Sequence, residues 1–179
     1  MSDVSGSMYD ESGGARYIDA CIALSLACSE MQTGSLRNRC LTFHSNPQWV
    51  IFGEGESLYD RVTKLYKSEW GYNTNIYKAF EKILNHIVEN DIDPDTIHDM
   101  KFLILSDMQF DAAGAMNNTV YEELKDLFST AGLKTIWGKP YSVPELIFWN
   151  LNGSNQNMVD TGKRRGITML SGFSPTAFY

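Results

Sequence analysis

Apolar residues recur along this chain with two different spacings, one typical of helices and the other of buried strands. A period of 3.6 predicts four helices, over residues 16–31, 58–66, 76–87 and 119–131. Short runs rich in aliphatic and aromatic residues predict five strands, at 39–44, 48–52, 101–106, 145–151 and 167–170. A last helix is expected to begin at Ser174-Pro175.

The order of the predicted elements favours an α/β fold in three layers. Strands that alternate with helices imply a mostly parallel sheet with helices on both faces, in the Rossmann-like manner. The exception is the pair joined by the turn Asn46-Pro47, whose two strands must run antiparallel, which gives one antiparallel edge strand. The helix at 16–31 is apolar almost all round, so we expect it to be largely buried. Because no linker interrupts the pattern, residues 1–179 are predicted to form one domain.

Oxygen-bearing side chains occupy three loops that this fold brings to one edge of the sheet. The chain opens with D-x-S-x-S, and in an extended segment Asp3, Ser5 and Ser7 would point the same way. Asp107 directly follows an apolar strand, at the position where open α/β sheets bind ligands. Thr74 precedes the third predicted helix, and right-handed crossovers place the three loops together. Two carboxylates and three hydroxyls suit a hard divalent cation, Mg²⁺ or else Mn²⁺ or Ca²⁺.

Charge and composition limit the partners and the cellular location that we expect for this chain. The formal net charge is -7, which disfavours binding to a phosphate backbone. No apolar run approaches the roughly 20 residues of a membrane span, and no signal peptide is visible, so we expect no membrane partner. The odd set Cys21, Cys28 and Cys40 contains no C-x-x-C pair. It favours reduced, buried thiols in an intracellular protein, either cytoplasmic or nuclear.

With these motifs the chain resembles a von Willebrand factor A domain. In that family a metal-ion-dependent adhesion site combines D-x-S-x-S with a later threonine and a later aspartate. The matching residues here are Asp3, Ser5, Ser7, Thr74 and Asp107. The resemblance implies that the hydroxyls contact the metal and that one or both aspartates act through water. It also implies a binding module, not an enzyme, whose protein partner supplies a Glu or Asp carboxylate to the metal.

Two finer similarities extend the resemblance. D-V-S-G-S-M is similar to the intracellular A domains of Ro (TROVE) proteins, which implies ribonucleoprotein association through regions outside this chain. The stretches S-D-M-Q-F-D and P-E-L-I-F-W-N-L, with T-M-L-S-G-F-S-P, resemble an uncharacterised family of plant and giant-virus proteins. In those proteins the A domain follows a helical region, so this chain is expected to be a fragment of a longer protein.

The start of the chain departs from the family pattern. An apolar central strand leads into the first aspartate of the family, whereas only Met1-Ser2 precede Asp3 here. We therefore expect that strand to be missing or truncated, or replaced by another segment. A gap at the centre of the sheet would loosen the loop that holds Asp3 and weaken metal binding.

A metal-dependent phosphoester hydrolase is the first alternative, since aspartates at strand ends and a cation can support that chemistry. It lacks an identifiable general base. The three histidines, His44, His86 and His98, fall in none of the predicted site loops, and we expect them on the surface or on helix faces. The sequence also has no G-x-S-x-G elbow and no phosphate-binding P-loop.

Three further patterns carry less weight. Lys163-Arg164-Arg165 is the local support for RNA binding, and a basic run of this length is more typical of a solvated face. The acidic stretch around Asp93 lacks the glycine and glutamate of a calcium-binding EF-hand, so a solvated loop is expected over 90–99. The side chains that flank the site either form an apolar rim for a partner or pack beneath the loops. They are Trp70, Tyr72 and Met108.

Overall fold

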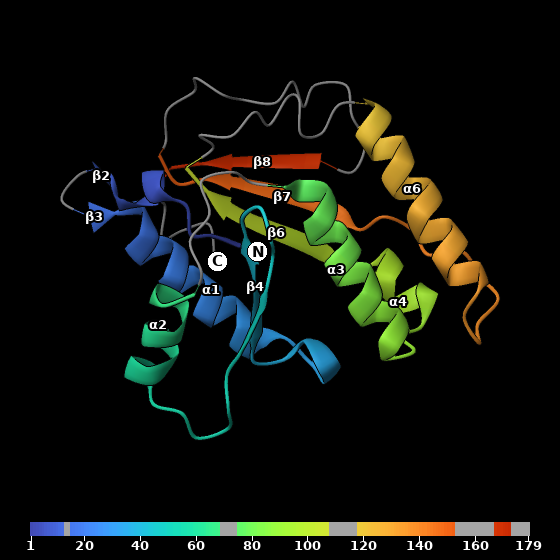
Figure 1. Cartoon of the computed structure of the whole chain (residues 1–179), viewed down its shortest axis with the longest axis horizontal. Helices are drawn as coiled ribbons and strands as arrows, with labels where there is room; N and C mark the ends of the chain where they lie inside the picture. Colours follow the sequence, from blue (N-terminus) through green and yellow to red (C-terminus); the bar gives the residue numbers. More distant parts are fainter. Residues whose placement is uncertain (13–14, 69–74, 108–117, 153–166, 173–179) are drawn as a thin grey trace.

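A six-stranded sheet forms the centre of the computed structural model (Figure 1). The strands lie in the order β5 (Trp49–Ile51), β4 (Arg39–Phe43), β1 (Ser2–Asp3), β6 (Lys101–Ser106), β7 (Glu145–Asn150) and β8 (Ile167–Ser171). All neighbours pair in parallel except β4 and β5, so the predicted antiparallel edge strand is confirmed. The structure describes residues 1–12, 15–68, 75–107, 118–152 and 167–172.

Helices cover both faces of the sheet, as the three-layer prediction requires (Figure 1). On one face lie α1 (Tyr17–Met31) and α2 (Leu58–Tyr66), and on the other α3 (Ile76–Glu89), α4 (Pro94–His98) and α6 (Asn118–Leu133). Two 3-10 turns, η1 (Gly6–Tyr9) and η2 (Gly34–Leu36), and a small hairpin of β2 (Glu11–Ser12) and β3 (Ala15–Arg16) complete the described elements. None of the described helices is long and apolar enough to span a membrane.

Local sequence explains where the helices on the second face begin. The Asn75 side chain accepts a hydrogen bond from the backbone N–H of Lys78 and caps α3. Helix α4 was not predicted, because the stretch was interpreted as a solvated acidic loop. Asp93 caps it by accepting from the N–H of Asp95, and Pro94 has a backbone angle suited to a first helical turn.

The burial of α1 was overestimated from its sequence. Its apolar face packs on the sheet, but Ala23 and Ala27 on the opposite face are exposed to solvent.

The three cysteine thiols are free, as expected. Cys21 and Cys40 are buried, whereas Cys28 is only half-buried.

The central strand of the sheet, β1, has two residues. Ser2 and Asp3 themselves lie between β4 and β6, where Ser2 faces Thr42 on one side and Leu105 on the other. Its neighbours are longer, at five residues in β4 and six in β6. Among the described residues, Ser2 and Asp3 form the central strand, and no other segment lies between β4 and β6.

Two apolar cores separate the sheet from its helices. The core under α3 and α6 is built on aromatic rings, since Phe80 lies 5.9 Å from Phe102 and 6.3 Å from Phe128 between ring centroids. The core under α1 and α2 contains Met8 and Leu65, both almost fully buried. Because both cores use the sheet as one wall, they fix its twist and the position of its carboxyl edge.

We expect Phe80→Ala to lower the free energy of unfolding by about 3–5 kcal/mol, because it removes a ring that is 0% exposed. Urea denaturation followed by circular dichroism measures the change. Tyr59→Ala is the matched control, since that ring is 77% exposed and its loss should cost under about 0.5 kcal/mol. Equal losses for the two variants would contradict the placement of this core.

Candidate metal centre

Asp3 and Asp107 lie at the carboxyl ends of adjacent parallel strands. Asp3 ends β1, and Asp107 follows the last residue of β6. Because β1 and β6 pair in parallel, both carboxylates lie at the same edge of the sheet. Both residues are buried, with exposed fractions of 1% for Asp3 and 3% for Asp107. The predicted convergence of these two segments is thus present in the structure.

The opening loop is held by its own hydrogen bonds. The N–H of Ser5 donates to Oδ1 of Asp3 at 2.9 Å, which closes a turn immediately after β1. The chain then enters the 3-10 turn η1, in which the N–H of Met8 donates to the carbonyl of Ser5. The prediction of an extended D-x-S-x-S segment was therefore wrong beyond Ser5. The turn nevertheless brings the hydroxyls of Ser5 and Ser7 to 3.2 Å from each other.

Met8 lies in the core under α1 and α2 and connects the opening loop to the loop that begins at Asp107. Its side chain is 0% exposed, and its sulfur accepts a hydrogen bond from the backbone N–H of Asp107 at 3.2 Å. Under the strand, the Cys21 thiol donates to the carbonyl of Asp3 at 3.5 Å. Burial raises the pKa of that thiol to about 12, so it remains a neutral donor. Met8 and Cys21 thus fix the backbone of both aspartates.

The Asp3 carboxylate is in an unfavourable environment for a charge. Burial raises its pKa to about 6, and the nearby charge of Asp107 adds to this effect. Hydrogen bonds from the Ser106 and Ser5 side chains and from the Ser5 N–H act in the opposite direction. Ser106 donates its hydroxyl to Oδ2 of Asp3 at 2.5 Å. Our sequence analysis missed Ser106, although it is the last residue of the strand that leads into Asp107.

The donor set fits a hard divalent cation. Two buried carboxylates provide the charge that such an ion neutralises, and the Ser5 and Ser7 hydroxyls provide neutral oxygen ligands. Among the described residues, no three His, Cys, Asp or Glu side chains gather in a metal-binding group. The candidate centre therefore combines carboxylates with hydroxyls, which are ligands of hard cations, whereas zinc sites use mainly Cys and His.

Several predicted residues lie outside the part of the chain that the structure describes. Thr74 is the fifth predicted ligand, and its position relative to Asp3 stays a prediction. The same holds for the proposed rim and for the basic run. These residues are Trp70, Tyr72, Met108, Lys163, Arg164 and Arg165.

The histidines differ from expectation in one case. His98 is on the surface, and His86 lies on α3, where its Nε2 is 3.1 Å from the Ser35 hydroxyl. Burial lowers the pKa of His86. His44 was wrongly assigned to a surface or helix face, because it is 2% exposed and directly follows β4. It therefore lies at the same edge of the sheet as Asp3, although in a different loop from any that the sequence singled out.

Comparisons with known proteins give a matching family and a viral relative. The family described as "Domain of unknown function (DUF7788)" matches residues 1–178. The "Uncharacterized protein L728" of Acanthamoeba polyphaga mimivirus is 32% identical over 176 residues. That alignment covers 96% of this chain and 28% of the viral protein, so the chain spans less than a third of this relative.

The fold also matches a solved structure, that of the Ro (RSR) protein of Deinococcus radiodurans. The TM-score is 0.60 at 17% sequence identity, and the match covers 98% of this chain and 31% of the Ro chain. At this identity the likeness concerns the fold.

We expect the stability difference between the wild type and Asp3→Asn to depend on pH. The folded state holds the Asp3 proton more tightly than the unfolded chain, because its pKa rises from 3.8 to about 6. The stabilisation that this proton gives is full below pH 3.8 and is lost as the pH rises through 6. In EDTA, the variant should gain up to about 3 kcal/mol relative to the wild type between pH 4 and 7.

Urea denaturation across this pH range measures the difference. Asp10→Asn is the matched control, because Asp10 is exposed and lies outside the candidate centre. A difference between wild type and Asp3→Asn that stays constant with pH would contradict the burial of a titrating carboxyl at this position.

Ser106→Ala should raise the pKa of Asp3 further, because it removes a hydrogen bond to the charged carboxylate, and such a bond contributes about 1.5–3 kcal/mol. Carboxyl-carbon NMR in EDTA follows the titration directly. Ser29→Ala serves as the control, since Ser29 is equally buried but donates to the carbonyl of Leu26. An unchanged Asp3 titration in Ser106→Ala would show that this hydroxyl does not stabilise the carboxylate.

Proposed function

We propose that this chain, which belongs to the DUF7788 family, is a module that binds a divalent cation and, through that cation, an acidic group of a protein partner. The cation, Mg²⁺ or Mn²⁺, would be held by Asp3, Ser5, Ser7 and Asp107. Thr74 is expected as a further ligand from the sequence pattern alone.

One observation carries the proposal, the convergence of Asp3 and Asp107 at the edge of the sheet beside two hydroxyls. Burial raises the pKa of Asp3, and repulsion by the nearby Asp107 carboxylate adds a smaller contribution. A divalent cation removes this repulsion and offsets both negative charges. Hydroxyl ligands add no charge, so the two carboxylates and the divalent cation together would be close to neutral. Such a centre would not repel an acidic ligand.

Solvent access also supports a binding role. Asp3 and Met8 are sealed from solvent, but Ser7 is half-buried and Gly6 is exposed at the start of η1. A cation held by the Ser5 and Ser7 hydroxyls would therefore lie near the surface. Hard cations of this type commonly keep water at some coordination positions. A carboxylate oxygen from a partner would replace such a water.

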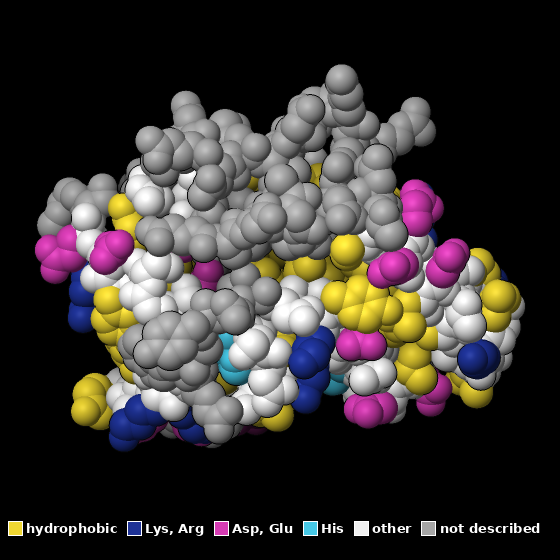
Figure 2. Space-filling view, turned by 45° about the horizontal axis from the view of Figure 1, so that its top comes forward, with side chains coloured by type: hydrophobic (Ala, Val, Ile, Leu, Met, Phe, Trp, Pro, Cys, Tyr) yellow, Lys and Arg dark blue, Asp and Glu magenta, His cyan; other side chains and the backbone are white. Residues whose placement is uncertain are grey.

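The alternatives keep less support. For RNA binding, Figure 2 shows Lys and Arg side chains of the described residues in separate places on that face, with acidic side chains gathered over the end formed by α3 and α6. Ribonucleoprotein association through other regions, and an intracellular location, stay predictions.

For hydrolysis, a general base is needed, and His44 lies at the same edge of the sheet as Asp3. However, His44 is buried, and its Nδ1 accepts a hydrogen bond from the N–H of Asn46.

Isothermal titration of Mg²⁺ and Mn²⁺ into the protein tests the cation. We expect one site in the wild type, affinity at least tenfold weaker in Ser7→Ala, and no binding in Asp107→Asn. Asp10→Asn should bind like the wild type, since it removes a nearby carboxylate outside the centre. Circular dichroism verifies that each variant is folded. Equal heats in wild type and Asp107→Asn would refute the site.

A second measurement addresses the partner's chemistry. Bound Mn²⁺ with open coordination positions enhances the relaxation of water protons, and added acetate should reduce this enhancement by displacing water. Release of phosphate from p-nitrophenyl phosphate with Mg²⁺, abolished by Asp107→Asn, would instead establish the hydrolase. We expect no such release.

A further inference from the structure

A groove of about 450 Å³ lies between α3 and α6 at the surface of the protein. The two helices run side by side, with their carboxyl-terminal ends at the same end of the molecule (Figure 1). The floor of the groove is apolar, because it consists of Leu84, Val88, Leu127 and Ala131. The last three are only half-buried, so apolar surface is open to solvent here. We refer to this space as the helix groove, and its rim is completed by Asn85, Glu89, Thr130 and Lys134.

A cluster of exposed apolar side chains continues from one end of the helix groove. Lys134 of the rim is preceded by Leu133 and followed by Ile136 and Trp137, and these three apolar residues are exposed. The Trp137 indole N–H donates to the carbonyl of Asp91, just beyond α3, at 3.1 Å. The cluster therefore lies where α3 and α6 both end. Large exposed apolar side chains gathered in one place typically mark an interaction surface.

The segment that carries this cluster is held against the end of α6. The backbone N–H of Thr135 donates to the carbonyl of Gly132 at 3.1 Å, so the chain turns directly after the helix. A Cβ on Gly132 would lie 2.4 Å from backbone atoms of Lys139 and Tyr141, which means that the returning chain packs on the helix backbone itself. The apolar cluster is thus presented on a fixed backbone, and a partner that binds it loses little free energy to ordering this segment.

Negative charge surrounds the helix groove. The two segments that carry the groove, residues 76–100 and 118–139, contain nine Asp and Glu against five Lys. Two of these lysines already pair with neighbouring carboxylates. Figure 2 shows acidic side chains around apolar ones over the end formed by α3 and α6. A partner with positive charge would therefore be attracted to this surface.

Three carboxylates follow the line of the groove. Glu81 and Glu123 each precede a lining residue by four positions, which places them in line with the groove and one helical turn before it. Glu89 lies on the rim. All three are exposed, and none forms an ion pair within the described part of the chain. Because Lys134 lies at the opposite end from Glu81 and Glu123, the negative charge is strongest where the groove begins and weaker where it meets the apolar cluster.

The groove suits a helix better than an extended segment. The backbone groups of α3 and α6 are hydrogen-bonded within each helix, so they offer no ladder to an extended peptide. A helix satisfies its own backbone and needs only an apolar stripe, whose side chains pack between those of the two neighbouring helices. Along α6 the groove extends from Leu127 to Lys134, which is about two helical turns at about 1.5 Å per residue.

We propose that the helix groove and the adjoining apolar cluster bind a basic amphipathic helix of a protein partner. Apolar residues of that helix at positions i, i+3, i+4 and i+7 contact the floor, and its flanking Lys or Arg side chains meet Glu81, Glu89 and Glu123. The groove contains no residue of the candidate metal centre, and it lies on the opposite side of the sheet from α1 and α2. This interaction therefore does not rest on the proposed cation site.

Titration in EDTA with the peptide acetyl-Lys-Ala-Leu-Lys-Lys-Leu-Leu-Lys-Lys-Leu-Ala-Lys-Lys-Leu-amide tests the proposal. We expect saturable one-to-one binding by calorimetry, with shifts in the amide NMR signals of Val88 and Ala131. A peptide of the same composition, with its leucines spread around the helix, should bind at least tenfold more weakly. The same loss is expected when glutamate replaces every lysine. Absence of binding, equal binding of either control peptide, or shifts confined to α1 and α2 would overturn the proposal.

Charge variants locate the binding on the protein. Glu123→Lys should weaken it about tenfold, and Lys134→Glu should strengthen it, since the two substitutions change the charge along the groove in opposite directions. Glu54→Lys is the matched control, because Glu54 is also exposed but lies in the loop after β5. Equal affinities of Glu123→Lys and Glu54→Lys would show a general attraction to an acidic protein and would refute the groove as the site.

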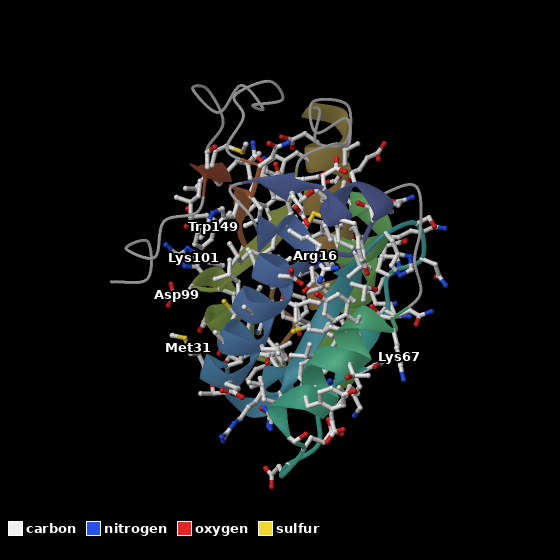
Figure 3. All side chains as sticks on the ribbon, turned by 90° about the vertical axis from the view of Figure 1, so that its left-hand side faces the viewer. Arg16, Met31, Lys67, Asp99, Lys101 and Trp149 are labelled. Atoms are coloured by element: carbon white, nitrogen blue, oxygen red, sulfur yellow. The ribbon has the colours of Figure 1, made fainter. Side chains whose placement is uncertain are left out.

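A second pair of variants tests the apolar cluster. Ile136→Ser removes a side chain that is 78% exposed and should weaken binding about fivefold, with the fold intact by circular dichroism. Met31→Ser is the control, since Met31 is 75% exposed and ends α1, on the other side of the sheet (Figure 3). Equal affinities of the two variants would contradict the proposal. A dimer in light scattering that the peptide cannot dissociate would do so as well, since it would make a second copy the occupant.

Discussion

The parallel pairing of two residues, Ser2 and Asp3, between β4 and β6 is the constraint on which the candidate centre depends. Without it the opening loop has no fixed position relative to Asp107, which follows β6. Parallel pairing aligns the carboxyl ends of all three strands, so acidic residues from the start and the middle of the chain meet. The pairing is short, and two hydrogen bonds add to it. The Cys21 thiol donates to the carbonyl of Asp3, and the sulfur of Met8 accepts from the N–H of Asp107.

The candidate centre holds the Asp3 carboxylate on a backbone fixed by hydrogen bonds, in a buried environment that disfavours its negative charge. Asp3 is almost fully buried, and its pKa of about 6 shows that burial outweighs three hydrogen bonds from Ser5 and Ser106. A buried carboxylate that is only partly compensated destabilises the folded state when it ionises. This property connects the stability of the domain to whatever neutralises the site, whether a proton or a cation.

Local sequence determined the elements of this protein, because their signals are contained within single segments. Apolar spacing located α3, β6 and β7, and the short Asn46-Pro47 turn identified the antiparallel pair. The motif D-x-S-x-S and the aspartate after β6 were predicted to share one edge of the sheet, and the structure brings Asp3 and Asp107 to the same edge. The centre thus rests on two of the three loops that were predicted, and Thr74 stays a prediction.

Contacts between distant segments were decided only by the tertiary structure. Ser106 reaches Asp3 across 103 positions in the chain, and the sulfur of Met8 meets the N–H of Asp107 across 99. The 3-10 turn after Ser5 and the burial of His44 likewise depend on packing beneath the loop and not on local propensity. Hydrogen bonding and burial are properties of the assembled edge, so a pattern along one segment specifies which groups are present but not which of them meet.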